Sequence, residues 1–208
     1  PGPGPWQPVP EERVRDVCRL DPAALAHADQ VLGQPWVAIR YGQLCHASGA
    51  ASMRPQEAFS VAKFLGATVA GAVSHRTRDL ARTRRKTGPF TDEDPVKQWL
   101  DYVSYNPDAR VAHVLAMVAQ SADLRPGRRV MEYDFLGVVQ LDSLSSMLNA
   151  AIRQPGSGLG SDLEAFTQRF MFEPLGIRES TWSLGLPDKT LAYGWNTHVL
   201  DMARLGLL

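Results

Sequence analysis

The chain has 208 residues, of which 44% are hydrophobic, and its 22 basic and 22 acidic residues give a formal net charge of zero. This length and composition are typical of a single globular domain, residues 1–208, with a sizeable core. A neutral chain carries no overall charge that attracts nucleic acid or anionic lipid, so we expect no nucleic-acid partner. No apolar run reaches the roughly 20 residues of a membrane span, so we expect no span.

Residues 1–20 begin with five prolines in ten positions, and we expect this stretch to be an extended lead-in because proline forbids regular structure. Residues 21–57 are expected to form a helix followed by a hairpin. Asp21 as N-cap, with a proline after it, predicts a helix from about residue 22 that ends at Gly33. Two β-rich stretches around a Gly42-Gln43 turn predict the hairpin.

The two cysteines, Cys18 and Cys45, have neither C-x-x-C spacing nor a paired-histidine pattern. We therefore expect no metal site and no cofactor, and we interpret the cysteines as two buried thiols. A disulfide between them would favour export, but the sequence does not show that their backbones come close enough. The sequence therefore leaves open whether the protein is soluble and cytoplasmic or exported.

Residues 58–208 are expected to form a mostly helical lobe, because apolar residues recur there at helical spacing. The expected helices begin with the run at 58–73 and continue at 94–103, 109–120, 136–152 and 162–176. Their apolar positions predict one core containing Val61, Leu65, Val69, Val114, Met117, Val139 and Leu144. A helix and a hairpin followed by a helical body make a mixed α+β fold.

The stretch "AFSVAKFLG" places Ser60 three residues before Lys63 at the start of the apolar helix at 58–73. Positions i and i+3 share a helix face, so the two side chains are expected to meet. A serine hydroxyl needs a base within hydrogen-bond reach to act as a nucleophile. Lysine can be that base where its surroundings favour the neutral amine, and the helix N-terminus would stabilise an oxyanion.

Several segments in order resemble the penicillin-recognising serine hydrolases, and most closely the branch related to class C β-lactamases. This branch includes esterases, D-alanyl-D-alanine peptidases and amide hydrolases. The resemblance covers most of the chain from Ala58 onward. The similar segments are "EAFSVAKFLGATVAGAV", "DEDPVKQWL", "ARVAHVLAMV", "LRPGRRVMEYDFLGVVQLDSL", "FMFEPLGIRESTW" and "THVLDMARLGLL".

The resemblance implies a β-lactamase/transpeptidase-like fold, with a helical lobe and part of an antiparallel sheet. It also implies that Tyr133 matches the tyrosine of a Y-x-N motif, which relays a proton to the leaving group. Phe135 stands where that motif has asparagine, and Asp134 is a candidate substitute. The "KTG" at 86–88 precedes Tyr133, so we interpret it as unrelated to the family's third motif. We expect the strands that carry that motif to be missing after residue 208.

We therefore predict a serine hydrolase that cleaves an ester or amide through an acyl-enzyme on Ser60, with Lys63 as base and Tyr133 as relay. The expected partners are a small-molecule ester or amide substrate and either a missing C-terminal segment or a second chain. One alternative is a catalytically impaired module that binds a ligand or partner in the same cleft. The other is a helical interaction protein in which Ser60 and Lys63 coincide by chance.

Overall fold

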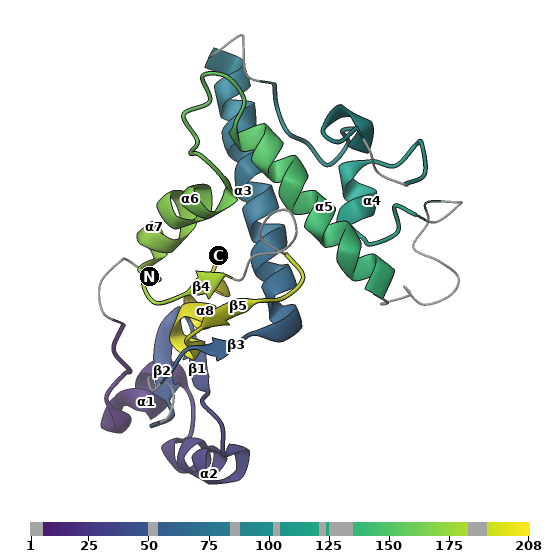
Figure 1. Ribbon diagram of the computed structural model, residues 1–208. Helices are drawn as coiled ribbons and strands as arrows, with labels where there is room; N and C mark the ends of the chain where they lie inside the picture. The colour runs from purple at the N-terminus through teal and green to yellow at the C-terminus, as the bar shows by residue number, and fades with distance from the viewer. Residues whose placement is uncertain are drawn as a thin grey trace. The chain divides into compact units, whose positions relative to one another are not determined.

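The structure is a computed structural model that describes residues 6–49, 54–83, 88–101, 105–120, 124, 135–182 and 191–208, without the side chains of 135–139. It is a mixed α+β chain with small antiparallel sheets (Figure 1), as the sequence predicted. Two compact units can be distinguished. The first contains Pro1–Glu57, Phe172–Thr181 and Asn196–Leu208, and the second contains Ala58–Met171 and Trp182–Trp195. The second unit begins where we expected the helical lobe to begin, but the first unit takes two later segments as well.

The first unit opens with a helix, α1 (Glu11–Cys18), which lies inside the stretch 1–20 that we expected to be extended. That expectation was wrong for these residues, because the prolines end at Pro10, which occupies the N-cap. The acidic side chains of the first turn suit the positive end of the helix dipole. Val14 and Cys18, four residues apart, form its buried face.

The predicted second helix is confirmed as α2 (Pro22–Leu32). The Asp21 carboxylate accepts a hydrogen bond from the Ala23 amide at 3.3 Å, and Gly33 closes the helix at a φ of 60°. Only a residue tolerant of positive φ ends a helix in this way at low cost, which explains why glycine marks the boundary in the sequence.

The predicted hairpin is confirmed as β1 (Val37–Arg40) paired with β2 (Gln43–Ala47). Tyr41 and Gly42 both have positive φ, so the turn lies one residue earlier than the Gly42-Gln43 turn that we expected. The register jumps between Ala38↔His46 and Ile39↔Leu44, which leaves Cys45 as the extra residue of a bulge. α1 packs against β2, and α8 (Val199–Leu205) packs against β1.

Cys18 and Cys45 form a disulfide, so the interpretation as two free thiols was wrong, although both residues are buried. The bulge gives the physical reason, because the register jump places two successive residues of β2 on the buried side. Cys45 thereby reaches the buried face of α1, where Cys18 lies at a Cα separation of 6.0 Å. The small core of Val14, Cys18 and Cys45 forms around this bond.

A second sheet of the order β3-β5-β4 joins distant parts of the chain. β3 (Gln56–Glu57) pairs antiparallel with β5 (Trp195–Thr197) in the register Gln56↔Thr197 and Glu57↔Asn196. The third strand, β4 (Thr181–Trp182), lies on the other side of β5. This pairing brings the segment after residue 195 back to the first unit.

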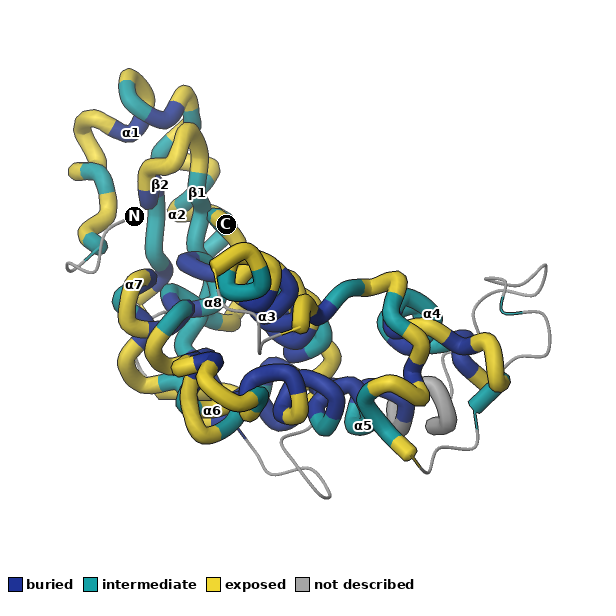
Figure 2. The backbone as a smooth tube through the Cα atoms, turned by 90° about the horizontal axis from the view of Figure 1, so that it is seen from above, coloured by how far each residue is buried: buried dark blue, intermediate teal, exposed yellow. Residues whose placement is uncertain are grey.

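The second unit is built on two long helices, α3 (Ala62–Thr83) and α5 (Phe135–Ile152), which pack against each other. α4 (Val111–Leu115) packs on α5 (Figure 1). Buried residues run along α3 and α5 (dark blue in Figure 2). The remaining helical pieces are η1 (Phe59–Val61), η2 (Val96–Gln98), α6 (Leu163–Thr167), a π-helical turn at Gln168–Phe172 and, counted with the first unit, α7 (Glu173–Leu175).

The predicted helices at 136–152 and 162–176 are confirmed, the second with a π-helical turn in its middle. The Asp162 carboxylate caps α6 by accepting from the Ala165 amide at 2.9 Å, and this hydrogen bond is the main cause that lowers the pKa of Asp162. The helices expected at 94–103 and 109–120 are shorter than expected. In the first of these segments, the Asp94 carboxylate stabilises a turn instead. It accepts hydrogen bonds from the backbone amide and hydroxyl of Thr91 and from the Trp99 indole.

The expected core is confirmed for Leu65, Val69, Val114 and Leu144, all at most 1% exposed. The prediction that Val61 belongs to the core was wrong, because this residue is 47% exposed. It belongs to η1, whose tighter three-residue turn rotates it away from the buried face of α3. Met117 is only partly buried, and its backbone has a φ of 57°. The side chain of Val139 lies outside the described residues.

Candidate active site

Ser60 and Lys63 come together as the sequence predicted. The short turn η1 carries Ser60 and leads directly into α3, which carries Lys63 on its first turn. The Lys63 Nζ lies 2.9 Å from the Ser60 Oγ, within normal hydrogen-bond distance. Ser60 is exposed and Lys63 is half-buried. An accessible hydroxyl is thus in direct contact with a basic side chain that the protein partly shields.

A second contact fixes the position of the Lys63 amine. Its Nζ also donates to the backbone carbonyl of Ala192 at 2.9 Å, so Lys63 joins two segments that are 129 residues apart in sequence. Ala192 is fully buried. One nitrogen thus contacts both the Ser60 hydroxyl and a buried backbone carbonyl, and these two contacts hold the amine at the serine.

The segment 191–195, which supplies this carbonyl, is anchored on α3 at Gly66. A Cβ placed on Gly66 would lie 2.9 Å from the Leu191 Cβ and 3.3 Å from the Leu191 carbonyl oxygen. This close approach of Leu191 requires glycine at position 66, because a Cβ in a folded protein essentially never lies within 3.0 Å of another heavy atom that is not bonded to it. At its other end, the Trp195 carbonyl accepts from the Ala58 amide at 2.7 Å. Sequence reasoning missed this segment, and Gly66 inside a helical pattern was the available signal.

The residue before Ser60 has an unusual backbone. Phe59 has a φ of 44°, in the left-handed region that a bulky residue occupies at a cost of about 1–3 kcal/mol. Its neighbours hold it there, since the Ala58 amide donates to Trp195 and the Ala58 carbonyl accepts from the Val61 amide at 3.0 Å. Strained residues that the surroundings enforce cluster at functional sites. Here the strain turns the chain sharply so that Ser60 lies exposed at the start of the helix.

The electrostatics at Ser60 favour negative charge. η1 and α3 form one continuous helical stretch, and its N-terminus carries roughly half a positive charge from aligned peptide dipoles. Ser60 lies within the first turn of that stretch. An oxyanion that forms next to the Ser60 hydroxyl therefore experiences a stabilising field from the helix.

A small cavity of about 100 Å³ opens beside Lys63. Apart from the lysine, its lining is apolar, from α3, α4, α5 and the segment 191–195. The lining residues are Lys63, Gly66, Ala67, Leu115, Met117, Leu141, Leu144 and Leu191. An apolar cavity of about 150 Å³ accepts benzene, so this smaller one suits a short aliphatic group.

The other expected site features fall outside what the structure describes. Tyr133 and Asp134 lie outside the described residues, and Phe135 starts α5 with its side chain undescribed. Of the "KTG" stretch only Gly88 is described, and its amide donates to the Gln154 side chain at 2.7 Å. The relay role of Tyr133 therefore stays a prediction.

Outside the Ser60 site, several of the described histidines contact carboxylates. His46 contacts both oxygens of Asp29 at 3.0 and 3.1 Å, and His198 lies 2.8 Å from Glu179. In the described part of the chain, no three His, Cys, Asp or Glu side chains are grouped so that they could hold a metal ion.

No model of a protein family matches the chain, and no curated protein matches it either. Over the described ranges, none of the helices has both the length and the apolar character that crossing a bilayer requires.

Proposed function

We propose that this chain is a serine hydrolase of the β-lactamase-like fold, which cleaves a small ester or amide through an acyl-enzyme on Ser60. The observation that carries the proposal is the 2.9 Å contact between the Ser60 Oγ and the Lys63 Nζ at a helix N-terminus. The order of sequence motifs described above supports it, as does the mixed α+β architecture. Hydrolysis needs a nucleophile, a base and an oxyanion site, and these residues supply candidates for all three.

In the first step the Ser60 Oγ attacks the substrate carbonyl carbon and its proton passes to the Lys63 amine. The ammonium so formed would keep its hydrogen bond to the Ala192 carbonyl, which stabilises the new positive charge. The substrate oxygen becomes an oxyanion, for which the Ser60 backbone amide and the helix dipole are the expected donors. Tyr133 is our candidate for passing the proton to the departing alcohol or amine.

In the second step water attacks the acyl-enzyme carbonyl, releases a carboxylic acid and returns a proton to Ser60. The apolar cavity beside Lys63 favours a short aliphatic acyl group, because its volume of about 100 Å³ leaves no room for a large one. No described residue separates esters from amides, and both belong to the proposal.

The test is intact-mass analysis after exposure to a fluorophosphonate, followed by peptide mapping of the adduct. We expect one adduct on Ser60, which the Ser60→Ala variant loses. The matched control is Ser161→Ala, since Ser161 is an exposed serine whose hydroxyl contacts a carboxylate and, among the described residues, no lysine. Labelling of Ser161→Ala at the wild-type rate, together with loss in Ser60→Ala, supports the assignment. Equal labelling of all three proteins contradicts it.

The role of Lys63 is tested by Lys63→Met, which keeps the length of the side chain and removes the amine. Loss of a general base slows the labelling of Ser60 by about 10²–10⁴-fold. Lys97→Met, at an exposed lysine of η2, is the control for the loss of one positive charge. An unchanged labelling rate of Ser60 in Lys63→Met would contradict the role of Lys63 as the base.

An impaired binding module in the same cleft is the second candidate, favoured by Phe135 at the position of the motif's asparagine. It predicts that a fluorophosphonate leaves the protein unlabelled while short esters bind without being cleaved. The labelling experiment therefore separates the two candidates.

A further inference from the structure

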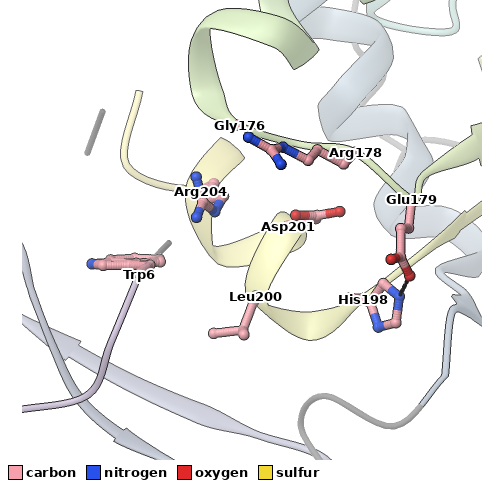
Figure 3. A pocket seen from close by; sticks show the side chains of 8 residues that line it. All are labelled: Trp6, Gly176, Arg178, Glu179, His198, Leu200, Asp201 and Arg204. Atoms are coloured by element: carbon pink, nitrogen blue, oxygen red, sulfur yellow. Dashed lines mark hydrogen bonds and ion pairs between the residues drawn. The ribbon is translucent and has the colours of Figure 1, made fainter. Parts of the chain in front are cut away.

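We propose a second ligand site in the first unit, which binds a small molecule that carries a carboxylate on an aromatic body. The site is a cavity of about 310 Å³ (Figure 3), within the range of small-molecule pockets. Its lining comes from the start of the chain, the turn after α7 and helix α8. The lining residues are Trp6, Gly176, Arg178, Glu179, His198, Leu200, Asp201 and Arg204. The proposal does not depend on Ser60 or on the hydrolase function.

Arg204 supplies a fixed positive charge at the cavity. It is only 6% exposed, which is rare for arginine, and its Nη1 donates to the Leu175 backbone carbonyl. The guanidinium also lies 5.8 Å from the centre of the Trp6 ring, within cation–π range. These contacts hold the group in one orientation, so that it loses little freedom when an anion binds.

Arg178 supplies a second guanidinium that is available to a ligand. Within the described residues, no hydrogen bond, ion pair or ring contact involves its side chain. Figure 3 shows this side chain extending over Asp201 towards Arg204. Two guanidinium groups directed at one space provide the paired donors with which proteins bind carboxylates.

The acidic residues of the lining are engaged with other groups. Glu179 is paired with His198 at 2.8 Å, and Asp201 accepts from the Ser180 hydroxyl at 3.4 Å. Burial is the main cause that raises the pKa of Asp201, with the nearby His198 and Arg204 acting in the opposite direction. The carboxylates of Glu179 and Asp201 thus already have partners within the first unit, and Arg178 stays available.

The apolar part of the ligand is assigned to Trp6 and Leu200. The indole of Trp6 offers a flat surface on which an aromatic ring stacks, and Leu200 adds an aliphatic side. The two guanidinium groups bind the carboxylate end. Phenylacetate combines both parts and is smaller than the cavity, so it is a suitable probe.

The experiment is isothermal titration calorimetry of the full chain with phenylacetate at low ionic strength. We expect a dissociation constant of about 1 mM or below for phenylacetate, and at least tenfold weaker binding of the neutral isostere phenylacetamide. Arg178→Gln should weaken phenylacetate binding about tenfold or more. Arg13→Gln, which removes the same charge from an exposed position on α1, should leave the binding unchanged. Trp6→Leu should also weaken it, while retaining the carboxylate preference.

The proposal is overturned by no binding at about 10 mM phenylacetate, by equal binding of the amide, or by equal affinity in Arg178→Gln and wild type. If Arg178→Gln and Arg13→Gln weaken binding equally, the protein attracts anions through its general charge and has no site here. Circular dichroism of each variant confirms that it is folded. Fluorophosphonate labelling of Ser60 should be the same in Arg178→Gln and wild type, so failure of this site and failure of the proposed hydrolase are distinguishable.

Discussion

Two glycines of helix α3 should respond differently to the same substitution. Gly66→Ala would place a Cβ 2.9 Å from the Leu191 Cβ, whereas at Gly71 no described atom lies within 4 Å of a new Cβ. Alanine is favoured over glycine in a helix interior by about 1 kcal/mol at either position. Forcing an extra carbon into packed surroundings costs about 1–3 kcal/mol, and this cost applies only at Gly66.

The difference in free energy of unfolding between the two variants measures the packing of Leu191 against position 66, since the gain in helix propensity is common to both. We expect Gly71→Ala to stabilise the protein by about 1 kcal/mol and to be about 1–3 kcal/mol more stable than Gly66→Ala. Urea unfolding followed by circular dichroism measures both free energies of unfolding. If the two variants agree within about 0.5 kcal/mol, Leu191 does not pack on α3, and the support for the Lys63 contact is lost.

Three further predictions concern the core, the disulfide and an acid-sensitive contact. Leu65→Ala should lower the free energy of unfolding by about 2–5 kcal/mol, because Leu65 is fully buried, and a loss below about 0.5 kcal/mol would refute its place in the core. Replacing Cys18 and Cys45 together by alanine should cost about 3–4 kcal/mol, as expected for a cross-link between residues 27 apart, and unchanged urea unfolding would contradict it. The hydrogen bond from His46 is the main cause that lowers the pKa of Asp29, so this stabilisation is present above the unfolded value of about 3.9 and is lost as the pH falls through the lower folded value. Asp29→Asn should therefore flatten the fall of the urea midpoint below about pH 4, and parallel curves for the two proteins would count against it.

Local signals predicted the elements whose ends are set by single residues. Asp21 and Gly33 fixed α2 because a cap side chain and a left-handed backbone act within a few residues of the helix end. The contact between Ser60 and Lys63 was predictable for the same reason, since helical spacing alone brings positions i and i+3 together.

Features that depend on distant partners were not predictable. The bulge that directs Cys45 towards Cys18 arises from the pairing of two strands, and no property of either cysteine reveals it. The contact between Lys63 and Ala192 joins segments far apart in sequence, which a reading of local patterns does not connect. Gly66 marks one side of that approach but does not identify its partner.

The pairing of β3 with β5 has a consequence for how the protein is made. About 140 residues separate Gln56 from Thr197, which it pairs with. At a ribosomal rate of about 5–20 residues per second, β3 is synthesised roughly 7–28 s before its partner strand, so it leaves the ribosome without that partner. During that interval its backbone groups are open to water, to chaperones and to other nascent chains. The first unit can therefore be completed only after its later segments, Phe172–Thr181 and Asn196–Leu208, have been synthesised.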